Sequence, residues 1–126
     1  MKNKLVTAIC AVLIVLVSSS VVGAPFGGKD DVNYSKTLWK AMVSAGYVGK
    51  HGIMSTPYVG QAPHGAILDT VDGKLKVSGK SNHVIIKRNY GGPGVSKEAV
   101  ANNPAKFLKA VTVMYKRPGY DADNKN

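Results

Sequence analysis

Cysteine is almost absent from this sequence. The single cysteine, Cys10, lies inside an uncharged run over residues 5–22. No disulfide can therefore form within the chain, although disulfides stabilise many small exported domains. The remaining residues must fold on a hydrophobic core alone.

The N-terminal residues have the pattern of a secretory signal. Lys2 and Lys4 precede the uncharged run, and the small residues 22–24 close it. We expect residues 1–24 to be a signal peptide and the mature chain to be periplasmic or secreted. The alternative is an uncleaved membrane anchor, because the run approaches the ~18 apolar residues that span a bilayer and Pro25 disfavours cleavage directly before it.

Arginine and acidic residues are also scarce. Only 2 of the 17 basic residues are arginine, and the chain has 7 acidic residues. Without the two signal lysines, 15 basic residues remain against 7 acidic ones, a net charge of +8. The scattered lysines and the expected export argue against nucleic-acid binding. The charge instead indicates a solvated surface that favours acidic partners.

Removing residues 1–24 from the 126 leaves 102, which is enough for one small domain. Residues 25–32 are rich in glycine and charge, so they predict a flexible leader. The domain itself is expected over residues 33–126. The sequence contains no internal repeat and no low-complexity tract that would divide it further.

One amphipathic helix is expected over residues 33–45. Asn33 or Ser35 can cap its start and Gly46 can stop it. Its apolar residues recur at spacings of three and four: Leu38, Trp39, Met42 and Val43. After the helix, glycine and proline break every period, so residues 48–63 predict a loop.

Turn residues then mark a series of short strands. The Asp72-Gly73 pair predicts a hairpin between strands over residues 66–71 and 75–77, because both residues tolerate a positive φ. A second turn is expected over residues 79–82. It leads into a strand over residues 84–90.

The C-terminal part predicts two short helical segments and a last strand. Ser96 can cap the first segment, and Asn103 followed by Pro104 can start the second. We expect the side chains of Phe107 and Leu108 to turn toward the core. The last strand is expected over residues 111–115.

These elements predict an α+β domain built on an antiparallel sheet with flanking helices. Residues 121–126 have the composition of a turn before another strand, yet no strand follows. We therefore expect the sheet to be incomplete at its C-terminal edge, which would expose backbone of residues 111–115. An ordinary C-terminal tail is the alternative.

Three segments carry a family resemblance. They are Pro63-His64-Gly65, VIIKRNYGG at residues 84–92 and VTVMYKRPGYD at residues 111–121. Together they resemble the cytochrome P-460 family, and the resemblance covers about residues 34–126. That resemblance implies an exported, usually dimeric mono-haem protein, related to the c-prime-beta cytochromes. It also implies periplasmic electron transfer with redox partner proteins, or oxidation or binding of hydroxylamine, nitric oxide and similar small nitrogen compounds.

The resemblance also suggests site residues. Lys87 matches the lysine that hydroxylamine-oxidising members cross-link to the haem, a role that burial can support by lowering the pKa of the amine. The alternative is a lysine that simply ends a strand in water. Thr112 and Met114 occupy the pocket-lining face where the family carries a glutamate. Neither can act as a general base, so enzymatic activity is left open.

The departures from the family concern haem attachment. Family members continue into an aromatic strand and a CxxCH segment, whereas this sequence stops before both. Covalent c-type attachment is therefore impossible in this chain, which we interpret as an incomplete copy ending before that segment.

Three histidines, His51, His64 and His83, are too widely spaced for a helical metal site. Of these, His64 is the candidate ligand for a metal or haem iron, and the alternative is a hydrogen-bonded turn residue. Two hypotheses remain for the whole chain. One is a P-460-like haem protein, and the other is a haem-free exported module that binds through its basic surface.

Overall fold

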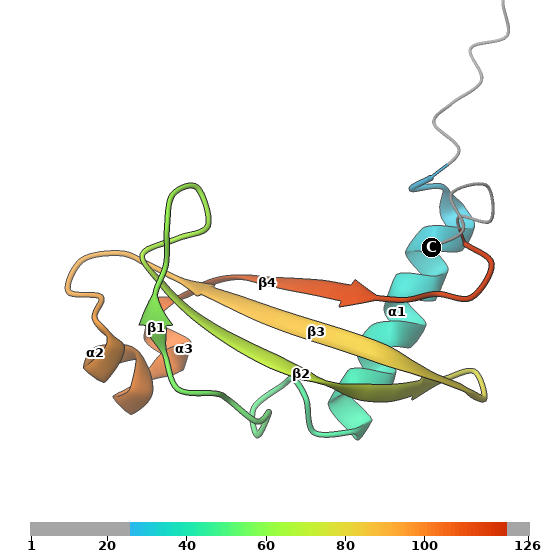
Figure 1. The fold of residues 1–126 in the computed structure, drawn as a ribbon, viewed down its shortest axis with the longest axis horizontal. Coiled ribbons are helices and arrows are strands. Elements are labelled where there is room, and N and C mark those ends of the chain that lie inside the picture. The colour runs from blue at the N-terminus through green and yellow to red at the C-terminus, as the bar shows by residue number, and fades with distance from the viewer. Residues whose placement is uncertain (1–25, 121–126) are drawn as a thin grey trace, which may run out of the picture.

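The computed structural model describes residues 26–120. Within this range the chain forms an antiparallel sheet with the strand order β1-β2-β3-β4, together with three helices (Figure 1). The predicted α+β class is confirmed. The predicted signal peptide lies outside the described residues. The elements are α1 (Lys29–Ser44), β1 (Tyr58–Val59), β2 (Ile67–Val77), β3 (Lys80–Tyr90), α2 (Lys97–Asn102), α3 (Pro104–Phe107) and β4 (Leu108–Tyr115).

Helix α1 begins at Lys29, before the predicted caps Asn33 and Ser35. Acidic side chains in its first turn complement the positive end of the helix dipole. One of them, Asp31, also accepts a 2.7 Å hydrogen bond from the backbone N–H of Gly27. The last part of the predicted flexible leader is therefore helical. Within residues 26–120, no helix has the length and apolar character needed to cross a membrane.

Strand β2 continues through the Asp72-Gly73 pair, so the hairpin predicted there is wrong. Asp72 and Gly73 stay in the ladder, paired with Ile85 and Val84. The ring of Tyr47 lies so close to Gly73 that a Cβ on this glycine would collide with the Tyr47 hydroxyl. A strand glycine often marks such a close approach. The chain instead reverses at Ser78 and Gly79, whose φ angles are 48° and 82°. One long hairpin of β2 and β3 replaces the two predicted ones.

The C-terminal helices agree with their predicted caps. The Ser96 side chain accepts a hydrogen bond at the start of α2, and the Asn103 side chain does the same at the start of α3. Phe107 is buried as expected, but Leu108 is 40% exposed, so its predicted core position is wrong. Leu108 opens β4, one of the two edge strands within the described range.

The helices cover one face of the sheet. Two apolar clusters fill this covered face, one beneath α1 and one beneath α2 and α3, at opposite ends of the long hairpin (Figure 1). The loop between α1 and β1 lies between them, as its hydrogen bonds to Asp69 and Arg88 show. The buried members of the two clusters are Met42, Val48, Leu75, Val77, Val84, Ile86 and Ile67, Tyr90, Val100, Phe107.

A candidate binding face on the sheet

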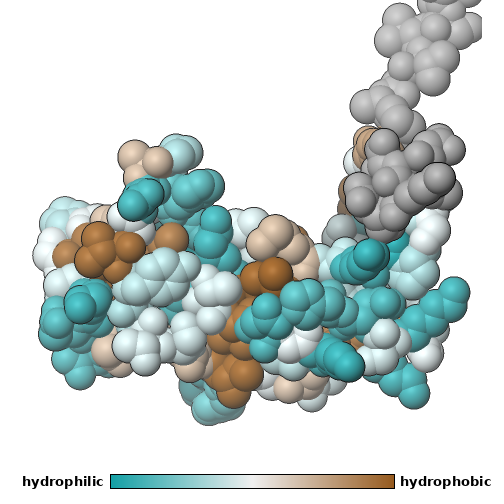
Figure 2. All heavy atoms as spheres, in the orientation of Figure 1, coloured by the Kyte–Doolittle hydropathy of each residue, from teal (hydrophilic) through white to brown (hydrophobic). Residues whose placement is uncertain are grey.

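Among residues 26–120, no helix packs on the opposite side of the sheet, here called the outer face. Side chains alternate across a strand, so the neighbours of the buried positions on β2, β3 and β4 point to this side. Figure 1 is viewed from this side, with the strands in front of α1, and Figure 2 shows an apolar band crossing the middle of a largely hydrophilic surface. The outer-face side chains are Leu68, Thr70, Asp72, Lys74, Lys76, His83, Ile85, Lys87, Asn89, Ala110, Thr112 and Met114.

The three strand residues predicted from the sequence lie together on this face. Lys87 is paired with Thr70 of β2 on one side and with Thr112 of β4 on the other, so the three form one row across the sheet. Met114 is paired with Ile85 in the next row and is 53% exposed. The structure therefore brings Lys87, Thr112 and Met114 to one surface.

His64 joins this row from the loop between β1 and β2. The Lys87 Nζ lies 3.4 Å from the His64 Nδ1. The Asn89 Nδ2 donates a 2.7 Å hydrogen bond to the His64 carbonyl, which fixes the loop against β3. Because a lysine ammonium can only donate, the imidazole accepts at Nδ1 and its neutral form carries the proton on Nε2.

Asn89 also carries an unpaired acceptor. Its Oδ1 is buried and has no hydrogen-bond partner among the described residues. Such an acceptor costs about 1–3 kcal/mol of stability unless a donor reaches it. A donor such as a water molecule beside this buried atom would satisfy it.

A second polar pair lies on the same face, closer to the hairpin turn. The His83 Nε2 contacts the Asp72 Oδ1 at 2.5 Å, and both side chains are more than half exposed. Sequence patterns missed this carboxylate because they placed Asp72 in a turn. Asp72 is paired with Ile85, so it shares a row with Met114. Residues 26–120 contain no cluster of three or more His, Cys, Asp or Glu side chains suited to a metal ion.

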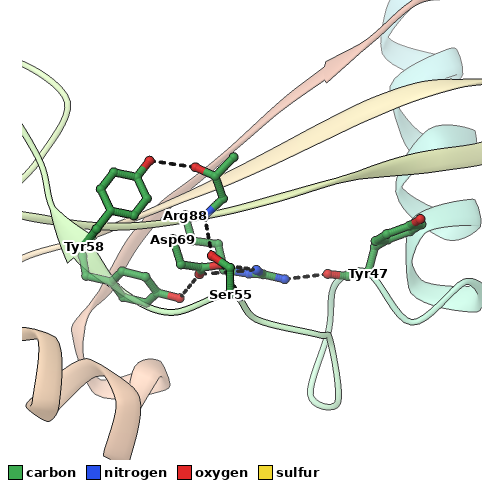
Figure 3. Close-up of polar contacts among 7 residues, drawn as sticks. Tyr47, Ser55, Tyr58, Asp69 and Arg88 are labelled. Atoms are coloured by element: carbon green, nitrogen blue, oxygen red, sulfur yellow. Dashed lines mark hydrogen bonds and ion pairs between the residues drawn. The ribbon is translucent and has the colours of Figure 1, made fainter.

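A buried ion pair lies on the covered face (Figure 3). The Arg88 Nη1 donates to both carboxylate oxygens of Asp69, at 3.1 and 3.4 Å, and its Nη2 donates to the carbonyl of Tyr47. Asp69 also accepts hydrogen bonds from the Tyr90 hydroxyl at 2.7 Å and the Ser55 N–H at 3.3 Å. Burial raises the pKa of Tyr90, and the hydrogen bond to Asp69 raises it further.

The roles of Arg88 and Tyr90 are structural. Asp69 is fully buried and Arg88 is 7% exposed, so the charges must pair with each other. Through Tyr47 and Ser55 the pair fastens the long loop after α1 to the sheet. Strand alternation in the sequence predicts the face that Arg88 occupies, although the motifs did not indicate it. Val84, Ile86, Arg88 and Tyr90 alternate along one strand, which puts Arg88 on the opposite face from Lys87.

Comparisons with protein-family models, with curated proteins and with solved structures found no match to this chain. The side chains of the outer face therefore indicate what the chain can bind. That face offers an amine, an imidazole, a hydroxyl and a thioether around one short stretch of β3, with a carboxylate in the adjacent row. These groups can donate and accept hydrogen bonds next to the apolar side chain of Ile85.

Proposed function

We propose that this chain is a cytochrome P-460-like, haem-binding domain whose outer face forms one wall of the haem site. This proposal rests on one arrangement of side chains. Lys87 and Thr112 lie in one row, Met114 lies in the next row, and His64 lies beside Lys87. The role is electron transfer, or redox chemistry or binding of small nitrogen compounds such as hydroxylamine and nitric oxide, in the periplasm or outside the cell.

Several residues of this face could hold a haem without covalent bonds. Imidazole and thioether groups can ligate haem iron, so His64 or Met114 would be able to serve as a ligand. Lys87 supplies a cation that can pair with a haem propionate, or an amine once it loses its proton. Residues 26–120 contain no cysteine for a thioether bond. Haem, when bound, would supply one-electron chemistry at its iron.

The side chains of the protein itself would then bind and orient the substrate. The Thr112 hydroxyl can donate or accept a hydrogen bond beside Lys87, and the Asp72 and His83 pair can hold a proton in the adjacent row. Hydroxylamine oxidation needs a base near its substrate, and Asp72 is the carboxylate on this face that could take that place.

Haem titration of the exported chain tests this proposal. We expect a Soret band that saturates at one haem per chain. His64→Ala should weaken the affinity for haem at least tenfold and shift the wavelength of the band. His51→Ala is the matched control, because His51 is exposed in the loop after α1. The absence of a saturable band, or equal losses for the two histidine variants, would contradict the proposal.

A haem-free basic binding module is the second candidate. Lys74 and Lys76 lie on the outer face beyond Lys87, so three cations share this side. Acidic ligands would bind such a surface with an affinity that falls steeply with salt. Salt-sensitive binding of an acidic peptide, together with no Soret band, would favour this candidate over the haem domain.

A further inference from the structure

Helix α1 exposes an apolar stripe on the side that faces away from the sheet. Val32, Trp39 and Val43 are 49%, 44% and 46% exposed. Their spacings of seven and four residues place them along one side of the helix. Met42 is buried and Leu38 packs against the same core cluster, so the helix is apolar on two sides rather than one.

The stripe contains a shallow hollow. Its volume is about 480 Å³, and it is lined by Val32, Ser35, Lys36, Trp39 and Lys40. The ring of Trp39 thus lies between aliphatic side chains and the stems of two lysines. Lysine stems can cover apolar surface while their ammonium groups stay in water.

The charges around the stripe have one sign. The three lysines of α1, Lys29, Lys36 and Lys40, are seven and four residues apart and run alongside the stripe. The acidic residues of the first turn, Asp30 and Asp31, lie on other sides of the helix. Asp31 is paired with Arg117 at 2.8 Å on β4's exit. The side of α1 that carries the stripe is therefore apolar and cationic, without a carboxylate.

From this combination we propose that α1 docks on an anionic phospholipid surface. A tryptophan among aliphatic side chains, flanked by lysines, matches the boundary between acyl chains and negatively charged headgroups. Val32, Trp39 and Val43 enter this boundary, and the three lysines pair with lipid phosphates. Because α1 packs on the covered face, the outer face with Lys87 points away from the membrane in this orientation.

Trp39 makes the proposal directly measurable. It is the single tryptophan of the 126 residues, so tryptophan fluorescence reports on this stripe alone. The chain is titrated with vesicles of mixed phosphatidylcholine and phosphatidylglycerol, and separately with vesicles of phosphatidylcholine. We expect a blue shift of the emission and protection from iodide quenching with the anionic vesicles, both reversed by high salt.

Two double variants separate this surface from general charge attraction. Lys36→Gln with Lys40→Gln should weaken vesicle binding by roughly tenfold to thirtyfold, since each lysine near an anionic surface contributes about 1 kcal/mol. Lys97→Gln with Lys109→Gln removes the same charge from α2 and the start of β4, away from α1, and should change binding less than twofold. All chains are compared in the same processed form, so that any contribution of residues 1–24 cancels. Circular dichroism verifies that each variant is folded.

Three results would overturn the proposal. Equal losses for the two lysine pairs would show attraction by net charge alone. Unchanged binding to the anionic vesicles after Val32→Ser with Val43→Ser would show that the stripe does not enter the bilayer. A blue shift that grows with protein concentration, without lipid, would show that a second copy covers the stripe instead.

Discussion

The Lys87 Nζ and the His64 Nδ1 lie 3.4 Å apart on the outer face of the sheet, although 23 residues separate them in the sequence. One nitrogen comes from a central strand and the other from a loop that folds back over it. A ligand that reaches either nitrogen therefore meets the other.

The buried pair of Asp69 and Arg88 predicts a large and selective loss of stability. Asp69→Asn leaves the Arg88 guanidinium buried without its counter-charge, which should lower the free energy of unfolding by about 3–5 kcal/mol. Urea denaturation followed by circular dichroism measures this. Asp72→Asn is the control, because Asp72 is exposed and should cost less than about 1 kcal/mol. Similar losses of unfolding free energy for the two variants would mean that the buried pair contributes no more to stability than the exposed Asp72 does.

Tyr90 predicts a loss of stability in alkaline solution. Burial, then the hydrogen bond and charge of Asp69, raise the pKa of Tyr90 above its ordinary value of 10.0. The neutral hydroxyl is thus favoured in the folded state, so its stabilisation is complete below pH 10 and declines as the pH rises above it. Tyr90→Phe should cost about 1–3 kcal/mol at neutral pH. The difference from the wild type should shrink above pH 10, and a constant difference would argue against the raised pKa.

Asp31 predicts the opposite pH dependence. Burial raises the pKa of its carboxyl, but hydrogen bonds from Gly27, Tyr120 and Arg117 outweigh burial, so that the pKa is lowered below 3.8. The stabilisation is present above this pH and is lost as the pH falls through the lowered pKa. Tyr120→Phe should move the pKa of Asp31 upward, toward its ordinary value. Carboxyl NMR titration measures this shift, and an unchanged pKa would exclude the hydrogen bond as its cause.

Gly73 predicts a steric effect with a specific rescue. Gly73→Ala places a methyl group against the hydroxyl of Tyr47 and should destabilise the fold by about 1–3 kcal/mol. Because the hydroxyl is the nearest atom, Tyr47→Phe in the same chain should recover part of this loss. Gly91→Ala is the control, since its new methyl group would meet only the Lys109 side chain at ordinary contact distance. Thermal melts of the wild type, Gly73→Ala, the double variant and Gly91→Ala measure these effects. If Tyr47 is not the obstacle, Tyr47→Phe will recover none of the lost stability.

Local signals predicted the local features of this fold. Ser96 and Asn103 each cap a helix through a residue three positions ahead, so a short window of sequence contains the whole interaction. The Asp72-Gly73 pair misled the prediction because it is held in the ladder with β3 and Gly73 packs against Tyr47 from a distant loop, contacts that a short window of sequence does not contain. A turn-forming pair can remain in a strand when tertiary packing opposes the turn.

The candidate site was predictable only in part, for the same reason. Lys87, Thr112 and Met114 follow from strand alternation and from a resemblance, and the sheet places them on one face. His64 reaches Lys87 through a loop whose path depends on the hydrogen bond between Asn89 and the His64 carbonyl. Sequence spacing contains no information on such a return path.

Lys87 and Arg88 are chemically alike neighbours with opposite surroundings, one beside an exposed imidazole and one inside the protein. A slip of β3 by one residue would exchange them, moving the lysine beside Asp69 and turning the buried Val84 and Ile86 to solvent. A lysine cannot reproduce the guanidinium fork that donates to both Asp69 and the Tyr47 carbonyl, so the slipped pairing is strongly disfavoured. The buried pair thus acts as a register lock, and it decides from inside the domain which side chains the outer face can offer.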